Sequence, residues 1–234
     1  RSDWQPGQLD HAGQRYAVVA LPRLAGDALP RLPVVLRLLL ENVVRHAHGA
    51  DREHAVQAVL NWLPQASSED EVPFVPGRVL MHDTTSTPAL VDVAAMRDVL
   101  AEHGRDPALL SPVLPVEVSV DHSLAVEVYA QPDAEHSNMG HEIRRNQERY
   151  RFLKWASDAM HTVHVNPPGT GIMHTINLEQ LATVVSTEVR DGQTWLVPDM
   201  MLGTDSHTPM VNGLGVLGWG VGGLDRKSTR LNSS

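Results

Sequence analysis

From Arg78 onward, short apolar segments that predict β-strands alternate with helical segments, and this alternation limits the possible folds more than any other feature. Strands are predicted over residues 78–82, 115–120, 162–165 and 200–203, and helices over 141–160 and over a segment that begins at the capping residue Thr87. Two further strands, 183–189 and 194–197, flank the hairpin turn Asp191-Gly192. Such alternation is typical of helices layered on a parallel sheet. We therefore predict an α/β fold with a largely parallel sheet.

The first 63 residues follow a different pattern. A short strand is predicted over 16–20, and the helix predicted over 32–46 is apolar nearly all round, as in a buried helix. A second helix is predicted over 51–63, with Asp51 as its N-cap. The polar, proline-rich segment that follows predicts an exposed connection. The expected parts are an N-terminal helical segment with a short strand (1–63), an exposed linker (64–77), an α/β region (78–224) and a tail (225–234).

The tail DRKSTRLNSS resembles the translation of a sequencing adapter joined to a truncated reading frame. We therefore treat residues 225–234 as non-native and leave them out of the fold prediction. The native protein is expected to continue past Gly223.

Composition excludes several classes of protein. The chain has no cysteine, so it forms no disulfide and offers no thiolate to a metal. Its net charge of −9 disfavours binding to nucleic acid and to anionic membranes. No apolar run reaches the roughly 18 residues that a membrane span needs, and the polar N-terminus lacks the apolar core of a signal peptide. We expect a cytoplasmic protein with neither a nucleic-acid nor a membrane partner.

Four polar clusters follow predicted strands or lie on glycine-rich turns beside them: His82-Asp83, Asp121-His122-Ser123, Pro168–His174 and Asp205-Ser206-His207. Open α/β sheets bind ligands outside the carboxyl ends of their strands. Three clusters place a carboxylate beside an imidazole, and a carboxylate that holds an imidazole in one tautomer supports general acid–base catalysis. One such pair is more often a cap or a surface pair, but three at successive strand ends favour a catalytic site. The other histidines are predicted to be solvated: His46, His48, His54, His103, His136, His141, His161 and His164.

Two other motifs carry weaker signals. Residues 213–218 match the G-x-G-x-x-G pattern of dinucleotide sites, but the acidic residue expected about 20 positions later is missing before the tail. We interpret this segment as a glycine-rich helix that packs closely against neighbouring backbone. His141-Glu142 lacks the second histidine of the H-E-x-x-H zinc motif. A zinc hydrolase stays open as an alternative, and it would require stoichiometric zinc in the purified chain.

Taken together, these motifs resemble the N-terminal part of the aconitase family. The likeness is carried, in order, by residues 32–42, 81–98, 120–123, 145–155, 167–182 and 203–223. The resemblance implies a three-layer α/β/α arrangement of the aconitase N-terminal type. It also implies a hydro-lyase of the tricarboxylic acid cycle, which interconverts citrate and isocitrate through cis-aconitate by dehydration and rehydration.

The resemblance further implies roles for individual residues. Asp121 and His122 would form the acid pair that protonates the departing hydroxyl, and His174 and His207 would surround a [4Fe–4S] cluster and its water, braced by Asp205. The substrate would be contacted by His82, Asp205, Ser206 and His207. The cluster cysteines, the carboxylate-binding arginines and the serine base lie beyond this segment in the family. This chain is therefore expected to be inactive alone, to hold no cluster, and to have a tricarboxylic acid and the remaining C-terminal domains as partners.

His82 departs from the family pattern. Citrate-handling members commonly carry glutamine at this position, whereas the 2-methylcitrate dehydratase branch carries histidine. 2-Methylcitrate dehydratase is therefore an alternative. The RNA-binding iron regulatory proteins share these motifs as well, but the acidic net charge argues against RNA as a partner.

Overall fold

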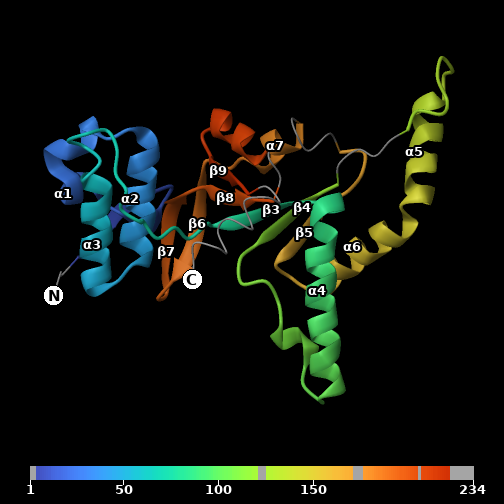
Figure 1. The fold of residues 1–234 in the computed structure, drawn as a ribbon, viewed down its shortest axis with the longest axis horizontal. Coiled ribbons are helices and arrows are strands. Elements are labelled where there is room, and N and C mark those ends of the chain that lie inside the picture. The colour runs from blue at the N-terminus through green and yellow to red at the C-terminus, as the bar shows by residue number, and fades with distance from the viewer. Residues whose placement is uncertain (1–3, 121–124, 171–175, 205–206, 222–234) are drawn as a thin grey trace. The chain divides into compact units, whose positions relative to one another are not determined.

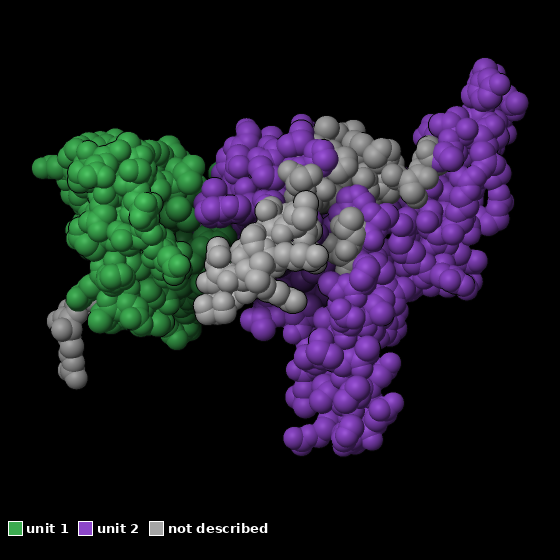
Figure 2. Space-filling view, viewed as in Figure 1, with its two compact units in different colours: residues 1–76, 183–199 green, residues 77–182, 200–234 purple. Residues whose placement is uncertain are grey.

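A computed structural model describes residues 4–120, 125–170, 176–204 and 207–221 (Figure 1). The chain forms two compact units, one made of Arg1–Pro76 with Thr183–Asp199 and the other of Gly77–Ala182 with Met200–Ser234 (Figure 2). Residues 183–199, predicted as part of the α/β region, belong in the structure to the same unit as the N-terminal residues.

The first unit contains a four-stranded sheet in the order β1-β2-β7-β6. Its strands are β1 (Gly7–His11), β2 (Gln14–Val18), β6 (Val185–Arg190) and β7 (Gln193–Pro198). β6 and β7 form the predicted antiparallel hairpin, and Asp191 and Gly192 both adopt the positive φ that such a tight turn requires. β2 and β7 meet in parallel at Ala17 and Trp195.

The helices of the first unit are α1 (Leu21–Ala25), the 3₁₀ helix η1 (Gly26–Arg31), α2 (Val34–His46) and α3 (Gly49–Leu60). Leu32, Leu40, Val44 and Val59 form their buried core. The prediction that 32–46 is a fully buried helix is wrong for its first turn, because Val34 and Val35 are exposed. Asp51 is not a cap, because α3 begins two residues before it and takes His48 as its N-cap residue.

The segment predicted as a linker contains no helix or strand and is mostly exposed. Near its end, the Asn42 side chain on α2 donates to the Val75 carbonyl over 2.8 Å and accepts from the Val75 amide over 3.0 Å. This pair of bonds holds the last part of the segment against the first unit.

The second unit is built on a five-stranded, fully parallel sheet, which confirms the predicted α/β fold. Its strands are β3 (Arg78–His82), β4 (Val116–Ser119), β5 (Val163–Asn166), β8 (Met200–Gly203) and β9 (Leu217–Gly220). The order β5-β4-β3-β8-β9 places β3 at the centre. The chain therefore adds strands on one side of β3, then returns to add β8 and β9 on the other side.

Helices cover both faces of this sheet, as a three-layer arrangement requires. The helices of the second unit are α4 (Asp83–Glu102), α5 (Ala134–Arg145), α6 (Gln147–Ala159) and α7 (Ile176–Leu181), with the 3₁₀ helices η2 (Pro107–Leu109) and η3 (Thr208–Leu214). Leu90 of α4 and Leu153 of α6 pack with Val118 and Val163 on one face. On the opposite face, Leu181 of α7 and Val211 of η3 pack with Leu80 and Met201. Figure 1 shows α5 extending away from the sheet.

Three predicted element boundaries are wrong. The single helix predicted over 141–160 is two helices that break at Asn146, whose side chain donates to the Glu142 carbonyl and carboxylate over 3.0 and 2.8 Å. α4 begins at Asp83 rather than at Thr87, so Pro88 lies inside the helix. The segment 213–218 is not a glycine-rich helix, because it contains the end of η3 and the start of β9.

Close packing accounts for the glycine at the end of that segment. A Cβ built on Gly218 would lie 2.8 Å from the Thr208 carbonyl oxygen, closer than van der Waals contact allows.

Of the helices in the described part of the chain, none combines the length and apolar character that a bilayer span requires.

Candidate active site at the carboxyl ends of the parallel strands

Three polar residues end neighbouring strands of the second unit, beside the point where the direction of strand addition reverses. The carboxyl ends of β3 and β8 flank this reversal, which we call the switch point, and doubly wound sheets bind ligands at such a crevice. His82, Ser119 and Asn166 are the last residues of β3, β4 and β5 and lie in register. On the other side, the Thr204 amide after β8 donates to the Leu80 carbonyl over 3.0 Å.

Two of the seven predicted site residues fall within the described part of the chain. His82 is buried at the end of β3, and His207 is exposed at the N-cap position of η3, four residues after the end of β8. Because β3 and β8 are neighbours, the strand ends that lead to these two histidines are adjacent. The other five lie outside the described residues: Asp121, His122, His174, Asp205 and Ser206. The roles assigned to all seven stay predictions.

His82 is held by the helix that follows it. Its Nδ1 accepts a hydrogen bond from the Thr84 amide over 3.1 Å, so the imidazole is the N-cap of α4. The Thr84 hydroxyl oxygen lies 2.7 Å from the same nitrogen. An N-cap acceptor satisfies one of the four unpaired amides at a helix start. The strand end and the helix start thus fix the position of the ring.

Asp83 has a charged partner from a distant part of the sequence. Its side chain is fully buried, and its Oδ1 lies 3.5 Å from His82 Nδ1. Its Oδ2 forms an ion pair with Arg149 Nε at 3.2 Å. The sequence places Asp83 beside His82 and does not predict Arg149 as a partner of either. Residue 149 lies in one of the segments that carry the family resemblance, but nothing in its spacing from Asp83 signals the contact.

The approach to His207 is fixed by packing at the end of β8. Gly203 ends this strand, and a Cβ built there would overlap the side chain of the fully buried Thr208. Thr208 is the first residue of η3 and follows His207 directly. The absence of a side chain at Gly203 therefore lets η3 start directly above the strand end.

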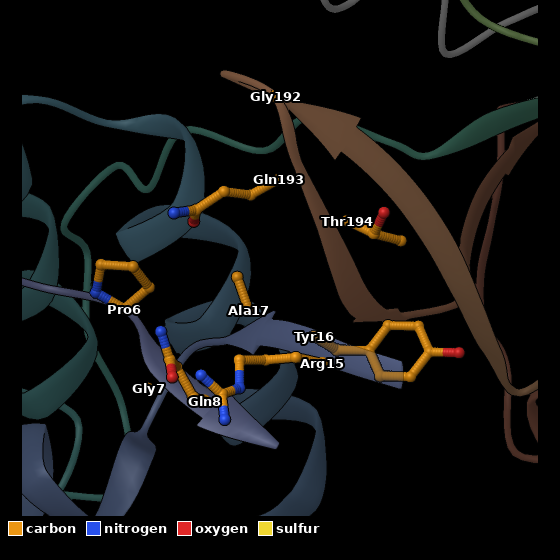
Figure 3. A pocket seen from close by; sticks show the side chains of 9 residues that line it. All are labelled: Pro6, Gly7, Gln8, Arg15, Tyr16, Ala17, Gly192, Gln193 and Thr194. Carbon is orange, nitrogen blue, oxygen red and sulfur yellow. The ribbon is translucent and has the colours of Figure 1, made fainter. Parts of the chain in front are cut away.

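A hollow lies in the first unit, between β1, β2 and the turn of the β6–β7 hairpin (Figure 3). It has a volume of about 280 Å³, and Gln8, Arg15, Tyr16, Gln193 and Thr194 are among its lining residues. Arg15 forms an ion pair with Asp10 at 2.9 Å, and none of the lining residues is a carboxylate or a histidine. This hollow therefore lacks the carboxylate and imidazole groups that mark the strand ends of the second unit.

His46 is not a solvated histidine as predicted, because it is half-buried between two arginines. Arg45 Nη1 lies 2.8 Å from its Nε2, and Arg190 Nη2 lies 3.0 Å from its Nδ1. Burial, followed by the charges of Arg45 and Arg190, lowers the pKa of His46 to about 4. The arginines also bind Glu188, over 2.7 Å from Arg45 and 2.9 Å from Arg190. This network joins α2 to β6 and is structural.

The described residues do not fit the ligand set of an iron–sulfur cluster. [4Fe–4S] clusters are held by cysteine thiolates, and the chain contains no cysteine. Across residues 4–120, 125–170, 176–204 and 207–221, no three side chains of the metal-binding types gather around one point.

A doubly wound α/β domain with an imidazole and a carboxylate at its switch point belongs to the class of ligand-binding domains that enzymes build on parallel sheets. A model of the aconitase family (aconitate hydratase) matches residues 53–233, and the chain belongs to this family. It is 45% identical to aconitate hydratase A of Pseudomonas aeruginosa over 223 residues, 94% of this chain and 24% of the relative. Aconitate hydratase A of Escherichia coli is 44% identical over 227 residues, 95% of this chain and 25% of the relative. The chain therefore spans about a quarter of the length of these curated relatives.

Proposed function

We propose that this chain forms part of the active-site wall of a hydro-lyase that interconverts citrate and isocitrate through cis-aconitate. Membership of the aconitase family supports the reaction class. The observation that supports this proposal for the chain itself is the position of His82. This residue ends β3 at the switch point, and its imidazole is the N-cap of α4.

Within this proposal the chain supplies acid and binding groups. Dehydration must expel hydroxide, a poor leaving group, so a proton has to reach the departing oxygen. Asp121 and His122 are proposed to deliver it, as the resemblance to the family implies, and Asp121 follows Ser119, the last residue of β4, by two positions. Asp205, Ser206 and His207 follow β8 and are proposed to bind the substrate with His82. His174, which follows the end of β5 by eight positions in the sequence, is proposed to contact the site as well.

The rest of the active site is proposed to come from other domains of the same protein. Relatives carry about three quarters of their length outside the matched segment. We place there the [4Fe–4S] cluster, whose open iron would polarise the substrate hydroxyl as a Lewis acid. We also propose that the complete protein acts in the cytoplasm.

A chimera tests this function. The matched segment of the Pseudomonas aeruginosa aconitate hydratase A is replaced by the corresponding residues of this chain, and cis-aconitate formation from citrate and isocitrate is measured. We expect activity, and a loss of about 10²–10⁴-fold in kcat for His122→Gln, the range for removal of a general acid. A chimera that folds and contains its cluster, yet dehydrates neither acid, would refute the proposal.

2-Methylcitrate is the alternative substrate, because this chain has His82 where citrate-handling relatives commonly carry glutamine. The same chimera is assayed with 2-methylcitrate. A kcat/KM higher than that for citrate would assign the chain to the 2-methylcitrate dehydratases.

A further inference from the structure

We propose that the amide of Thr84 holds His82 in the tautomer that carries its proton on Nε2, so that His82 can act at the switch point only as a hydrogen-bond donor. Its ligand there would be an anionic or hydroxyl oxygen of the substrate. The identity of this ligand rests on the proposed function, whereas the tautomer does not.

The tautomer follows from the donors around Nδ1. A backbone amide can only donate, and the Thr84 amide reaches Nδ1 over 3.1 Å. A ring nitrogen that accepts this bond carries no proton, so a neutral imidazole must carry it on Nε2. The Thr84 hydroxyl lies 2.7 Å from Nδ1 and can donate to the same lone pair.

Asp83 is the group that would favour the opposite tautomer, since a carboxylate attracts a proton to the nearest nitrogen. Its Oδ1 is 3.5 Å from Nδ1, beyond the 2.7–3.2 Å that N–H···O bonds span. The other oxygen is 3.2 Å from Arg149 Nε, and the carboxylate occupies the first residue of α4, where the helix dipole favours negative charge. Arg149 and the helix dipole both compensate the charge of Asp83, which weakens the attraction of this carboxylate for a proton on Nδ1. Thr84, which donates to Nδ1, and Arg149, which binds Asp83, are therefore positioning residues for His82.

The consequence for binding is a preference for acceptors. An Nε2–H group donates and cannot accept, so it favours a carboxylate or hydroxyl oxygen and disfavours an ammonium or amide donor. Glutamine also offers an N–H donor on a flexible chain, whereas glutamate, of the same shape, offers only acceptors. His82→Gln and His82→Glu therefore form a matched pair that separates donation from size.

The tautomer is tested by ¹⁵N NMR of histidine-labelled chain, with the His82 resonances assigned by their loss in His82→Gln. We expect Nε2 protonated and Nδ1 unprotonated in the wild type and in Thr84→Val, which keeps the amide. Thr84→Pro removes the amide at a first-turn position where proline is tolerated, and should shift the proton toward Nδ1. A protonated Nδ1 in the wild type would overturn the proposal, whether or not Thr84→Pro folds.

The ligand is tested in the chimera with the matched pair. We expect His82→Gln to keep KM for citrate within about tenfold of the wild type, and His82→Glu to raise it by a further factor of about 100 or more, because two carboxylates would then face each other. Equal KM values for the two variants would overturn the donor role. An inactive wild-type chimera with an intact Nε2–H signature would instead count against the proposed function alone.

Discussion

The Nε of Arg149 lies 3.2 Å from the Oδ2 of Asp83, so a charge on α6 meets a fully buried carboxylate at the start of α4. These residues are 66 positions apart in the sequence, and both belong to the second unit. Removing one partner from a buried ion pair leaves the other charge in a medium of low dielectric constant.

Arg149→Met is therefore expected to lower the free energy of unfolding by about 3 kcal/mol, measured by urea denaturation of the chain. Arg151→Met, at an exposed position on the same helix, is the control and should change it by less than about 0.5 kcal/mol. Adding Asp83→Asn to Arg149→Met should recover part of the loss. Equal effects of Arg149→Met and Arg151→Met would show that the pair contributes nothing to stability.

Gly203→Ala is expected to destabilise the second unit by about 1–3 kcal/mol, because the new Cβ overlaps the buried side chain of Thr208. Gly140→Ala is the matched control: it lies inside α5, and a Cβ there meets no atom of the described residues within 4 Å. That substitution should instead stabilise by up to about 1 kcal/mol through helix propensity. Thermal unfolding of the two variants gives the comparison. Thr208→Gly removes the Cβ that would lie 2.5 Å from the new one, so it should rescue Gly203→Ala only if the overlap is the cause.

His46 is expected to make stability fall on acidification. Its pKa is about 4 in the folded chain and ordinarily 6.5, so below pH 6.5 the unfolded chain binds a proton that the folded chain does not. The free energy of unfolding therefore decreases as the pH falls from 6.5 to 4, and His46 causes no such decrease above pH 6.5. His46→Gln removes the titrating group. Because the ring is half-exposed and screened, the two chains should differ in this loss by only about 1 kcal/mol. Urea unfolding at pH 7 and pH 5 measures the difference, and parallel pH profiles would contradict the assignment.

Tyr150 is expected to lose its phenol proton only at high pH. Burial and its hydrogen bond to Glu142 raise the pKa of Tyr150 to about 12 from 10.0. The folded state keeps the phenol proton to higher pH, so the resulting stability is complete below pH 10 and is lost as the pH rises toward 12. Absorbance titration should show a late phenolate step that is missing in Tyr150→Phe. A titration unchanged by that substitution would mean that the raised pKa belongs to another residue.

Features that depend on neighbouring residues were predictable from the sequence. The strand Arg78–His82 and the hairpin around Asp191-Gly192 were predicted because strand alternation and turn chemistry act over a few residues. The parallel sheet followed from the order of such segments, and with it the placement of His82 at a strand end. Family motifs then supplied the expectation of a hydro-lyase, which the family match supports.

Other features were decided by contacts between distant residues. The start of α4 at Asp83 depends on capping by His82, and the charge of Asp83 is compensated by Arg149, which no local pattern brings to it. His46 looked solvated at a helix end, yet burial lowers its pKa, followed by the charges of Arg45 and Arg190. Arg190 lies 144 positions away in the sequence, and the hairpin brings it to α2. Periodicity records which side of an element is buried, but not which side chain of another element it meets. The partners of a buried charge or ring are set by packing, and so only the tertiary structure could determine them.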